Sequence, residues 1–235
     1  MAFLRTIDND TVAALPAARF AGRIVIVDNE AKIGAACEDL QRCEVIGFDT
    51  ETRPSFRAGV SYKVALLQLS TPDTCYLFRL NKIRLDNRIL KILGSRRILK
   101  IGADVTGDIR ALRALRDFKA DGFVDLQCEA SRWGIEEKSL RKLSAIVLGE
   151  RISKAQRLSN WEAGVLTEQQ REYAATDAWV CPCILEAMLR AEQPAGDLTI
   201  ISSVGMREEE AKRVKHHRRR APHRHHDTVK RSNTE

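Results

Sequence analysis

The chain has no histidine in its first 206 positions. All five histidines lie beyond that point, at His216, His217, His223, His225 and His226. A serine–histidine–aspartate hydrolase and a histidine-bearing zinc site both need an imidazole in the folded part of the chain. We therefore exclude both kinds of chemistry for residues 1–206.

Long apolar runs and paired cysteine motifs are also missing. No segment approaches the roughly 18 consecutive apolar residues of a membrane span, and the N-terminus lacks the basic-then-apolar order of a signal peptide. None of the six cysteines belongs to a C-x-x-C pair, so we expect reduced thiols and no zinc site. These absences predict a soluble, cytoplasmic protein with no membrane partner.

Positive charge is concentrated near the C-terminus. The formal net charge is +7, and residues 207–235 hold ten Lys or Arg against five Asp or Glu, which leaves +2 for residues 1–206. We expect 207–235 to be a disordered tail that adds non-specific affinity for nucleic acid or serves solubility or localisation. The predicted organisation is an N-terminal extension at 1–21, a folded domain at 22–192, and a linker with basic tail at 193–235.

Hydrophobic periodicity predicts a mixed α/β fold. Short connections between neighbouring strands indicate an antiparallel meander, and a later alternation of helices and strands indicates parallel crossover pairing. Pro182 lies inside the last helix and is expected to kink it. The expected strands are 22–27, 45–51, 62–70, 75–78, 98–101 and 123–126, and the expected helices are 30–42, 86–94, 105–115, 127–133, 139–148 and 167–189.

Two carboxylates stand at the end of the apolar run 45–51. Asp49 and Glu51 are two residues apart, and side chains alternate faces along a strand, so both should point the same way. Like charges this close repel unless a proton or a cation lies between them, and Mg²⁺ takes oxygen ligands. Taken alone, the pair also fits a strand that ends in an acidic turn, so the choice depends on whether further acids converge there.

Two later segments supply such acids. Asp104 and Asp108 follow strand 98–101, at the carboxyl end of the sheet, where open α/β sheets usually bind ligands. Helix capping is the simpler explanation of Asp104 but accounts poorly for Asp108, which lies about a turn inside the helix. Tyr173 and Asp177 are four residues apart on the last helix and share one face, which alone also fits an ordinary half-buried surface.

Together, D-x-E on a strand, an aspartate after a second strand and Y-x-x-x-D on a late helix resemble the three motifs of the DEDD superfamily of 3′–5′ exonucleases, in its tyrosine-bearing branch. The absence of histidine agrees with that branch, because the sister branch has histidine in place of the tyrosine. Residues 20–190 are similar to the RNase D and Werner-syndrome exonuclease group. The residues that carry this likeness are the run Phe-Asp-Thr-Glu-Thr-Arg-Pro, Ser139, Leu140, Leu143, Gly149, Lys154, Asn160, Trp161, Leu166, Gln170 and the run Tyr-Ala-Ala-Thr-Asp-Ala.

The resemblance implies a ribonuclease H-like fold, a mixed β-sheet flanked by helices, and hydrolysis that uses two divalent ions, Mg²⁺ or Mn²⁺. Asp49 is expected to bind both ions, Glu51 and Asp177 to complete one site, and Asp108 to act on the second through water. Tyr173 is expected to orient and help deprotonate the attacking water. The implied substrate is the 3′ end of single-stranded DNA or RNA, and the implied products are nucleoside 5′-monophosphates.

Some features depart from the family pattern or leave alternatives open. Asp104 is an extra acid, and no helicase, polymerase or second helical RNA-binding domain is expected on this chain. Arg53, Lys63 and Lys154 are candidates for steadying the phosphate backbone, although each alone also fits solvated surface charge. A non-catalytic nucleic-acid-binding or scaffold protein and a phosphohydrolase of small nucleotides stay open as alternatives. The sequence does not distinguish a DNA substrate from an RNA substrate, and it does not give the oligomeric state.

Overall fold

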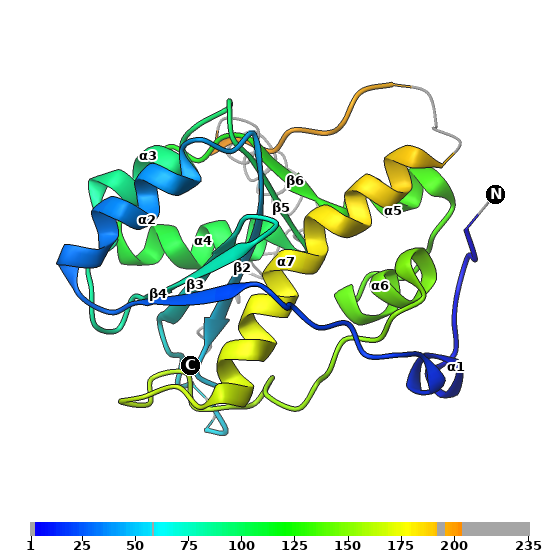
Figure 1. Cartoon of the computed structure of the whole chain (residues 1–235), viewed down its shortest axis with the longest axis horizontal. Coiled ribbons are helices and arrows are strands. Elements are labelled where there is room, and N and C mark those ends of the chain that lie inside the picture. The colour runs from blue at the N-terminus through cyan, green and yellow to red at the C-terminus, as the bar shows by residue number, and fades with distance from the viewer. Residues whose placement is uncertain (1–2, 58, 192–195, 204–235) are drawn as a thin grey trace, which may run out of the picture. The chain divides into compact units, whose positions relative to one another are not determined.

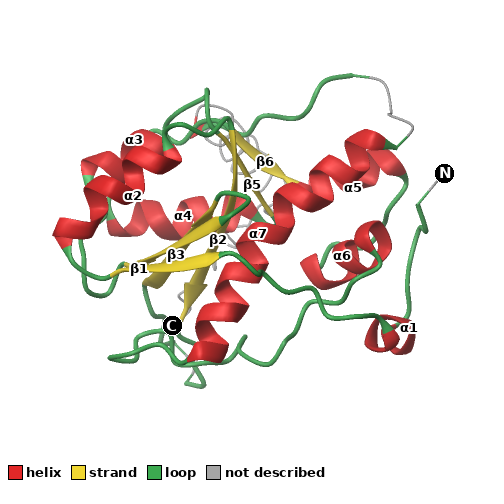
Figure 2. Cartoon of the chain, viewed as in Figure 1, coloured by secondary structure: helices red, strands yellow, loops and turns green. Residues whose placement is uncertain are grey.

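A six-stranded mixed sheet with helices on both faces runs through the computed structural model, which describes residues 3–57, 59–191 and 196–203 (Figures 1 and 2). Its elements are α1 (Asn9–Ala14), β1 (Arg23–Val27), η1 (Glu30–Lys32), α2 (Ile33–Leu40), β2 (Val45–Thr52), β3 (Val64–Ser70), β4 (Thr74–Arg79), α3 (Asn87–Leu93), β5 (Leu99–Gly102), α4 (Val105–Leu115), β6 (Phe123–Asp125), α5 (Leu126–Ala130), η2 (Ser131–Trp133), α6 (Leu140–Leu148) and α7 (Glu168–Arg190).

The strand order is β1-β4-β3-β2-β5-β6. Strand β3 pairs antiparallel with both β2 and β4, which confirms the predicted meander. Strands β2, β5 and β6 pair parallel, as the alternation of helices and strands predicts, and β1 adds parallel to β4 at the edge. The α/β class and the mixed sheet flanked by helices are therefore confirmed.

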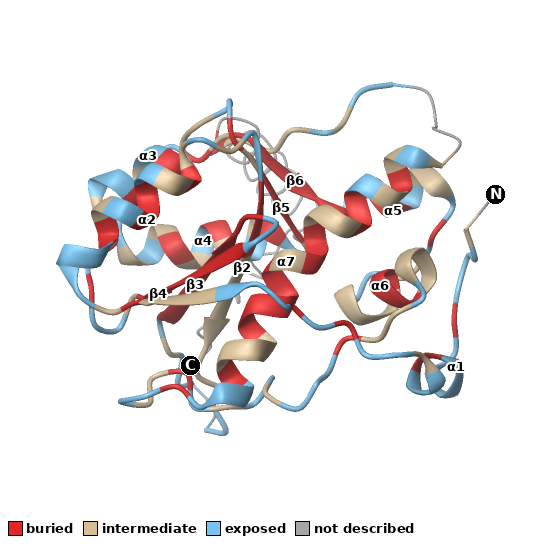
Figure 3. Ribbon diagram, viewed as in Figure 1, coloured by how far each residue is buried: buried red, intermediate tan, exposed pale blue. Residues whose placement is uncertain are grey.

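Helices α2, α3 and α4 lie on one side of the sheet, and α5, α6 and α7 lie on the other (Figure 1). On the first side, the Tyr76 hydroxyl of β4 donates a hydrogen bond of 2.6 Å to Asp39 of α2. On the second side, α7 crosses the strands, and Figure 3 shows buried positions on both α7 and the strands beneath it. The main apolar core on this side therefore lies between α7 and the sheet.

Helix α7 begins with a capping box formed by Thr167 and Gln170. Thr167 Oγ1 accepts from the Gln170 amide at 3.1 Å, while Gln170 Oε1 accepts from the Thr167 amide at 2.9 Å. These two bonds satisfy backbone donors that the first turn of a helix would otherwise leave unpaired. Pro182 lies inside the helix, but α7 continues through it to Arg190.

The contact between α7 and β2 is unusually close. Ala174, Ala175 and Ala178 are fully buried, and their small side chains allow the helix to approach its neighbour closely. A Cβ atom added at Gly47 of β2 would lie 2.0 Å from the carbonyl oxygen of Ala178. Only a residue without a side chain fits at position 47, so the sequence itself sets the spacing between strand and helix.

Segments beyond the predicted limits 22–192 also pack on the rest of the chain. Near the N-terminus, the Arg151 amide donates to the Pro16 carbonyl at 2.8 Å, and α1, which is too short to show periodicity, begins at an Asp8 cap. Near the C-terminus, the buried Glu129 carboxylate accepts from the Thr199 amide at 2.9 Å. The expected disordered tail lies outside the described residues, and the domain limits stay a prediction. Within the described chain, no helix has both the length and the apolar composition to cross a membrane.

Candidate active site and metal centre

The carboxylates of β2 stand where this strand runs beyond its neighbour. Strand β5 pairs only with residues 45–47, so within the described residues the positions that follow have no partner strand on that edge. On the other edge the register with β3 shifts between Glu51 and Thr52, an irregularity of the kind that re-aims side chains next to active sites. Asp49 and Glu51 are half-buried, and they lie on the face of the sheet that α7 covers.

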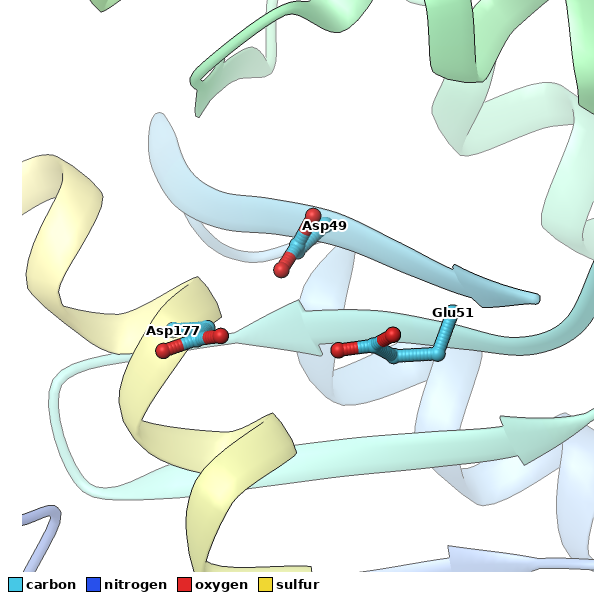
Figure 4. A group of neighbouring side chains, drawn as sticks. All are labelled: Asp49, Glu51 and Asp177. Carbon is cyan, nitrogen blue, oxygen red and sulfur yellow. The ribbon is translucent and has the colours of Figure 1, made fainter. Parts of the chain in front are cut away.

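Helix α7 adds a third carboxylate to this pair. Ligand oxygens of Asp49, Glu51 and Asp177 all lie within 4.8 Å of one another. Figure 4 shows the strand side chains and the helix side chain directed into one shared space. Asp177 is buried, and among the described residues its Oδ1 atom has no hydrogen-bond partner. The acids predicted from two distant motifs therefore converge.

Burial disfavours the ionised form of these three acids. It raises the pKa of Asp49 and Glu51 well above ordinary carboxyl values, and the charges of neighbouring acids raise both further. Burial also raises the pKa of Asp177, while its interaction with the Tyr173 hydroxyl opposes the rise. Close, desolvated carboxylates either hold protons or share a cation.

The donor set fits a hard divalent cation. Three carboxylate groups offer only oxygen, and Asp177 keeps a buried oxygen without a partner. Mg²⁺ and Mn²⁺ favour oxygen ligands of this type, whereas zinc and copper sites usually include histidine or cysteine. Asp49, Glu51 and Asp177 therefore fit one ion, which would supply the positive charge that these acids lack.

Asp108 lies outside this group of three, on the other side of β2. It comes from the first turn of α4, and its Oδ1 accepts a hydrogen bond of 2.5 Å from the Thr50 hydroxyl. The pKa of Asp108 is raised to about 8, chiefly by burial and next by the nearby Asp49 charge, while the Thr50 hydrogen bond opposes the rise. The charge of Asp49 therefore acts on Asp108, although the Asp108 carboxylate is hydrogen-bonded to Thr50.

Asp104 takes the N-cap position of α4 that the sequence predicts for it, yet its side chain makes no capping hydrogen bond. Its φ angle is +61°, in the left-handed region that residues other than glycine rarely adopt. The Asp104 amide donates to Asp125 Oδ1 at 3.2 Å, which helps hold the turn between β5 and α4. This turn directs the first turn of α4, and with it Asp108, toward β2.

Tyr173 stands one helical turn before Asp177. Burial raises the pKa of its phenol, and the charges of Asp177, Glu51 and Asp49 raise it further. Its ring packs against the buried Trp161, with the ring centroids 6.0 Å apart. A cavity of about 210 Å³ opens beside Tyr173 and Asp177, between α7 and the segments 17–19 and 152–156. The structure therefore leaves space for a ligand next to Tyr173 and Asp177.

Two polar residues near these acids, the half-buried Thr50 and the buried Gln68, escape sequence analysis. Thr50 points to the face opposite Asp49, and only the position of α4 reveals that its hydroxyl contacts Asp108. Gln68 of β3 pairs directly with Asp49, is fully buried, and has no hydrogen-bond partner within the described chain for either amide atom. A glutamine within the otherwise apolar run 64–69 is the one signal the sequence offers for Gln68.

The three basic candidates differ in their surroundings. Arg53 forms an ion pair of 3.3 Å with Glu162, and its guanidinium lies 4.8 Å from the centre of the Tyr62 ring. Lys63 and Lys154 are exposed, and neither forms an ion pair with a described carboxylate. Arg53 is therefore held in place, whereas the two lysines are solvated.

Comparisons with known proteins identify the family of this chain. A family model described as 3′–5′ exonuclease matches residues 24–191. The mouse bifunctional 3′–5′ exonuclease/ATP-dependent helicase WRN is 36% identical over 177 residues, which cover 70% of this chain but only 12% of that protein. The chain thus spans a small part of this longer relative.

Solved structures show the same fold. The EXO domain of Aedes aegypti Nibbler superposes with a TM-score of 0.63 at 25% identity, covering 80% of this chain and 90% of that domain. Trypanosoma brucei RNase D in complex with RNA U12 superposes with a TM-score of 0.66 at 20% identity, covering 96% of this chain and 78% of that one. These neighbours are ribonuclease H-like exonuclease domains. The chain therefore belongs to the 3′–5′ exonuclease family, within the DEDD superfamily and similar to RNase D and the Werner-syndrome exonuclease.

Proposed function

We propose that this protein removes nucleotides from the 3′ end of single-stranded DNA or RNA by metal-dependent hydrolysis and releases nucleoside 5′-monophosphates. The observation that carries the proposal is the convergence of Asp49, Glu51 and Asp177 within 4.8 Å, in a chain of the 3′–5′ exonuclease family. Its cytoplasmic location stays a prediction from sequence.

In the proposed mechanism Asp49, Glu51 and Asp177 would hold one divalent ion, and Asp49 would also bind a second ion, on which Asp108 would act through water. When bound, Mg²⁺ or Mn²⁺ would activate water and stabilise the charge that develops on the phosphoryl group and the leaving oxygen. The Thr50 hydroxyl holds the Asp108 carboxylate at 2.5 Å, so it limits the freedom of that side chain. Thr50 is therefore a positioning residue in this proposal.

Tyr173 is proposed to orient the attacking water. Its hydroxyl interacts with Asp177, and its ring is fixed against Trp161, so the phenol has a defined direction. The raised pKa keeps the phenol protonated near neutral pH, which makes it a hydrogen-bond donor to a developing anion and an acceptor toward water. The cavity beside Tyr173 and Asp177 is the proposed place of the terminal nucleotide.

Digestion of a 5′-labelled single strand with Mg²⁺ or Mn²⁺ tests the proposal. The native protein should produce a ladder of shortened strands, and Asp49→Asn should abolish the ladder, because it removes a ligand charge at nearly constant volume. Asp73→Asn is a matched control, since Asp73 is exposed in the turn between β3 and β4, at the opposite end of β2.

The same assay separates the competing functions. An unchanged strand with a folded, strand-binding protein would indicate a non-catalytic binding or scaffold protein. Hydrolysis confined to mononucleotides would indicate a phosphohydrolase of small molecules. Full activity of Asp49→Asn would contradict the assignment of the three carboxylates.

A further inference from the structure

A second cavity of about 520 Å³ lies between the segment that follows β2 and the segment that precedes α7. Arg53, Phe56, Arg57 and Tyr62 line it from the first segment, and Leu158 and Asn160 line it from the second. Two arginines and two aromatic rings thus face one hollow, and none of its lining residues is an acid. A hollow of this composition suits a ligand that is both flat and anionic.

The cavity holds the most exposed aromatic side chain of the described chain. Phe56 is 82% exposed, and Leu158 on the opposite wall is 60% exposed. A single exposed apolar residue is ordinary on a protein surface. Two large apolar side chains that line one basic hollow instead resemble the stacking platforms of proteins that bind single-stranded nucleic acid.

The positive charges around the cavity are of two kinds. Arg53 is held between Glu162 at 3.3 Å and the Tyr62 ring at 4.8 Å, so it is part of the cavity wall. Arg57 and the neighbouring Lys63 and Arg157 are exposed, and no described carboxylate forms an ion pair with them. These cations are therefore available to a phosphate backbone that passes along the rim.

Both walls are tied to elements that carry the active-site acids. Arg53 follows Glu51 by two residues on the same stretch of chain. On the other wall, the Gln170 side-chain amide donates to Ser159 Oγ at 2.6 Å and to the Asn160 carbonyl at 3.2 Å. Gln170 lies on α7, three residues before Tyr173, so the cavity is fixed relative to the site of cleavage.

We propose that this cavity binds one unpaired base of a single-stranded nucleic acid, a short distance upstream of the 3′ end. The base stacks on Phe56 against Leu158, and the adjoining phosphates contact Arg57 and the other exposed cations. The proposal rests on the exonuclease function proposed above. It makes the protein select for single strands, because a base inside a duplex is not free to enter the cavity.

Equilibrium binding tests this without any cleavage. A 5′-fluorescein-labelled hexanucleotide is titrated with the full chain in EDTA and followed by fluorescence anisotropy. Phe56→Ala should raise Kd roughly 5- to 150-fold, the range of one base–aromatic stack. Leu4→Ala is the control, since Leu4 is also apolar and 61% exposed but does not line the cavity.

An abasic scan makes the test specific to stacking. Hexanucleotides that lack one base are compared in the native protein and in Phe56→Ala. At one position, removal of the base should weaken binding by the native protein and leave the variant unaffected, because both changes delete the same contact. Equal losses of affinity in both proteins at every abasic position overturn the proposal. Native affinity of Phe56→Ala for the intact hexanucleotide also overturns it.

Cleavage distinguishes failure of this inference from failure of the proposed function. In Mn²⁺, Phe56→Ala should lower kcat/KM for the intact hexanucleotide and leave it unchanged for the hexanucleotide that lacks the base identified by the abasic scan. Normal cleavage of both substrates by the variant refutes the base-binding cavity and leaves the exonuclease intact. A native protein that neither binds nor cleaves the strand refutes both.

Discussion

The substitution Gly47→Ala tests whether the spacing between β2 and α7 determines the geometry of the active site. Gly47 lies on β2 two residues before Asp49, and Ala178 on α7 follows Asp177 directly. The added Cβ would be 2.0 Å from the Ala178 carbonyl oxygen, 2.6 Å from its carbonyl carbon and 3.2 Å from Pro182 Cδ. Backbone atoms and a proline ring cannot rotate away, so strand and helix must separate.

The distance by which β2 and α7 must separate determines the expected losses of stability and of cleavage rate. Ordinary contact for a Cβ atom begins at 3.4 Å, so α7 must move by more than about 1 Å from β2. Overpacking of this kind typically costs about 1–3 kcal/mol in the free energy of unfolding. Asp177 moves with Ala178, away from Asp49 and Glu51, and a displacement of about 1 Å can lower the rate roughly 10²-fold.

Urea unfolding and the initial rate on a 5′-labelled strand measure the two effects. Gly164→Ala serves as a control, because a Cβ there meets no atom within 4 Å and the backbone angle at Gly164 is not in the left-handed region. The free energy of unfolding of the control should lie within about 0.5 kcal/mol of the native value, and the control should cleave at the native rate.

Two outcomes would refute the reasoning. Native stability and native rate in Gly47→Ala would mean that α7 does not lie as close to β2 as the structure places it. A loss of stability with an unchanged rate would mean that the helix separates without carrying Asp177, so that the spacing does not set the geometry of the acids.

The remaining predictions concern metal, proton and packing at the same site. The raised pKa values of Asp49, Glu51 and Asp177 mean that the folded, metal-free protein keeps protons that the unfolded chain releases above about pH 4. In EDTA, the free energy of unfolding should therefore fall as the pH rises from about 5 to about 7, and it should fall less steeply in Asp49→Asn. Equal slopes of this free energy against pH in the two proteins would contradict the raised pKa of Asp49. Mn²⁺ at a hundred times its Kd should add about 2.7 kcal/mol to the free energy of unfolding. Identical calorimetric melting curves with EDTA and with Mn²⁺ would mean that the three carboxylates do not form a metal site. Tyr173→Phe should slow cleavage roughly 10²- to 10⁴-fold with little change in Mn²⁺ affinity by titration calorimetry, and an unaltered rate would leave Tyr173 as a packing residue. Gln68→Met should raise the free energy of unfolding in EDTA by about 1 kcal/mol or more, since it removes a buried amide without partners, and destabilisation would show that the amide is bonded.

Local patterns of the sequence predict much of the fold. The mixed sheet follows from the length of the connections, because a meander needs only short turns and parallel pairing needs a crossover. The start of α7 follows from the Thr167 and Gln170 capping pair, whose hydrogen bonds involve residues three apart. The pairing of Asp49 with Glu51 on one face follows from the two-residue period of a strand. These features depend on near neighbours, so one sequence suffices to predict them.

Other features depend on residues that the chain brings together from far apart. Sequence periodicity misses α1 and the packing of residues 196–203, because a six-residue helix and an extended segment show little pattern of their own. The Thr50 contact with Asp108 spans 58 positions, and it exists because α4 approaches the face of β2 opposite Asp49. Such distances between side chains are set by packing between layers, not by local preference.

The sequence by itself determined the acids, the tyrosine and the strand and helices that carry them. Tertiary structure alone decided that Asp49, Glu51 and Asp177 form one group while Asp108 is held separately by Thr50. It also decided that Phe56 and Leu158, from segments about 100 positions apart in the chain, face one basic hollow. The physical reason is that alternation and helical period fix the direction of a side chain relative to its own element, whereas the approach of α7 to Gly47 and of α4 to Thr50 fixes which side chains meet.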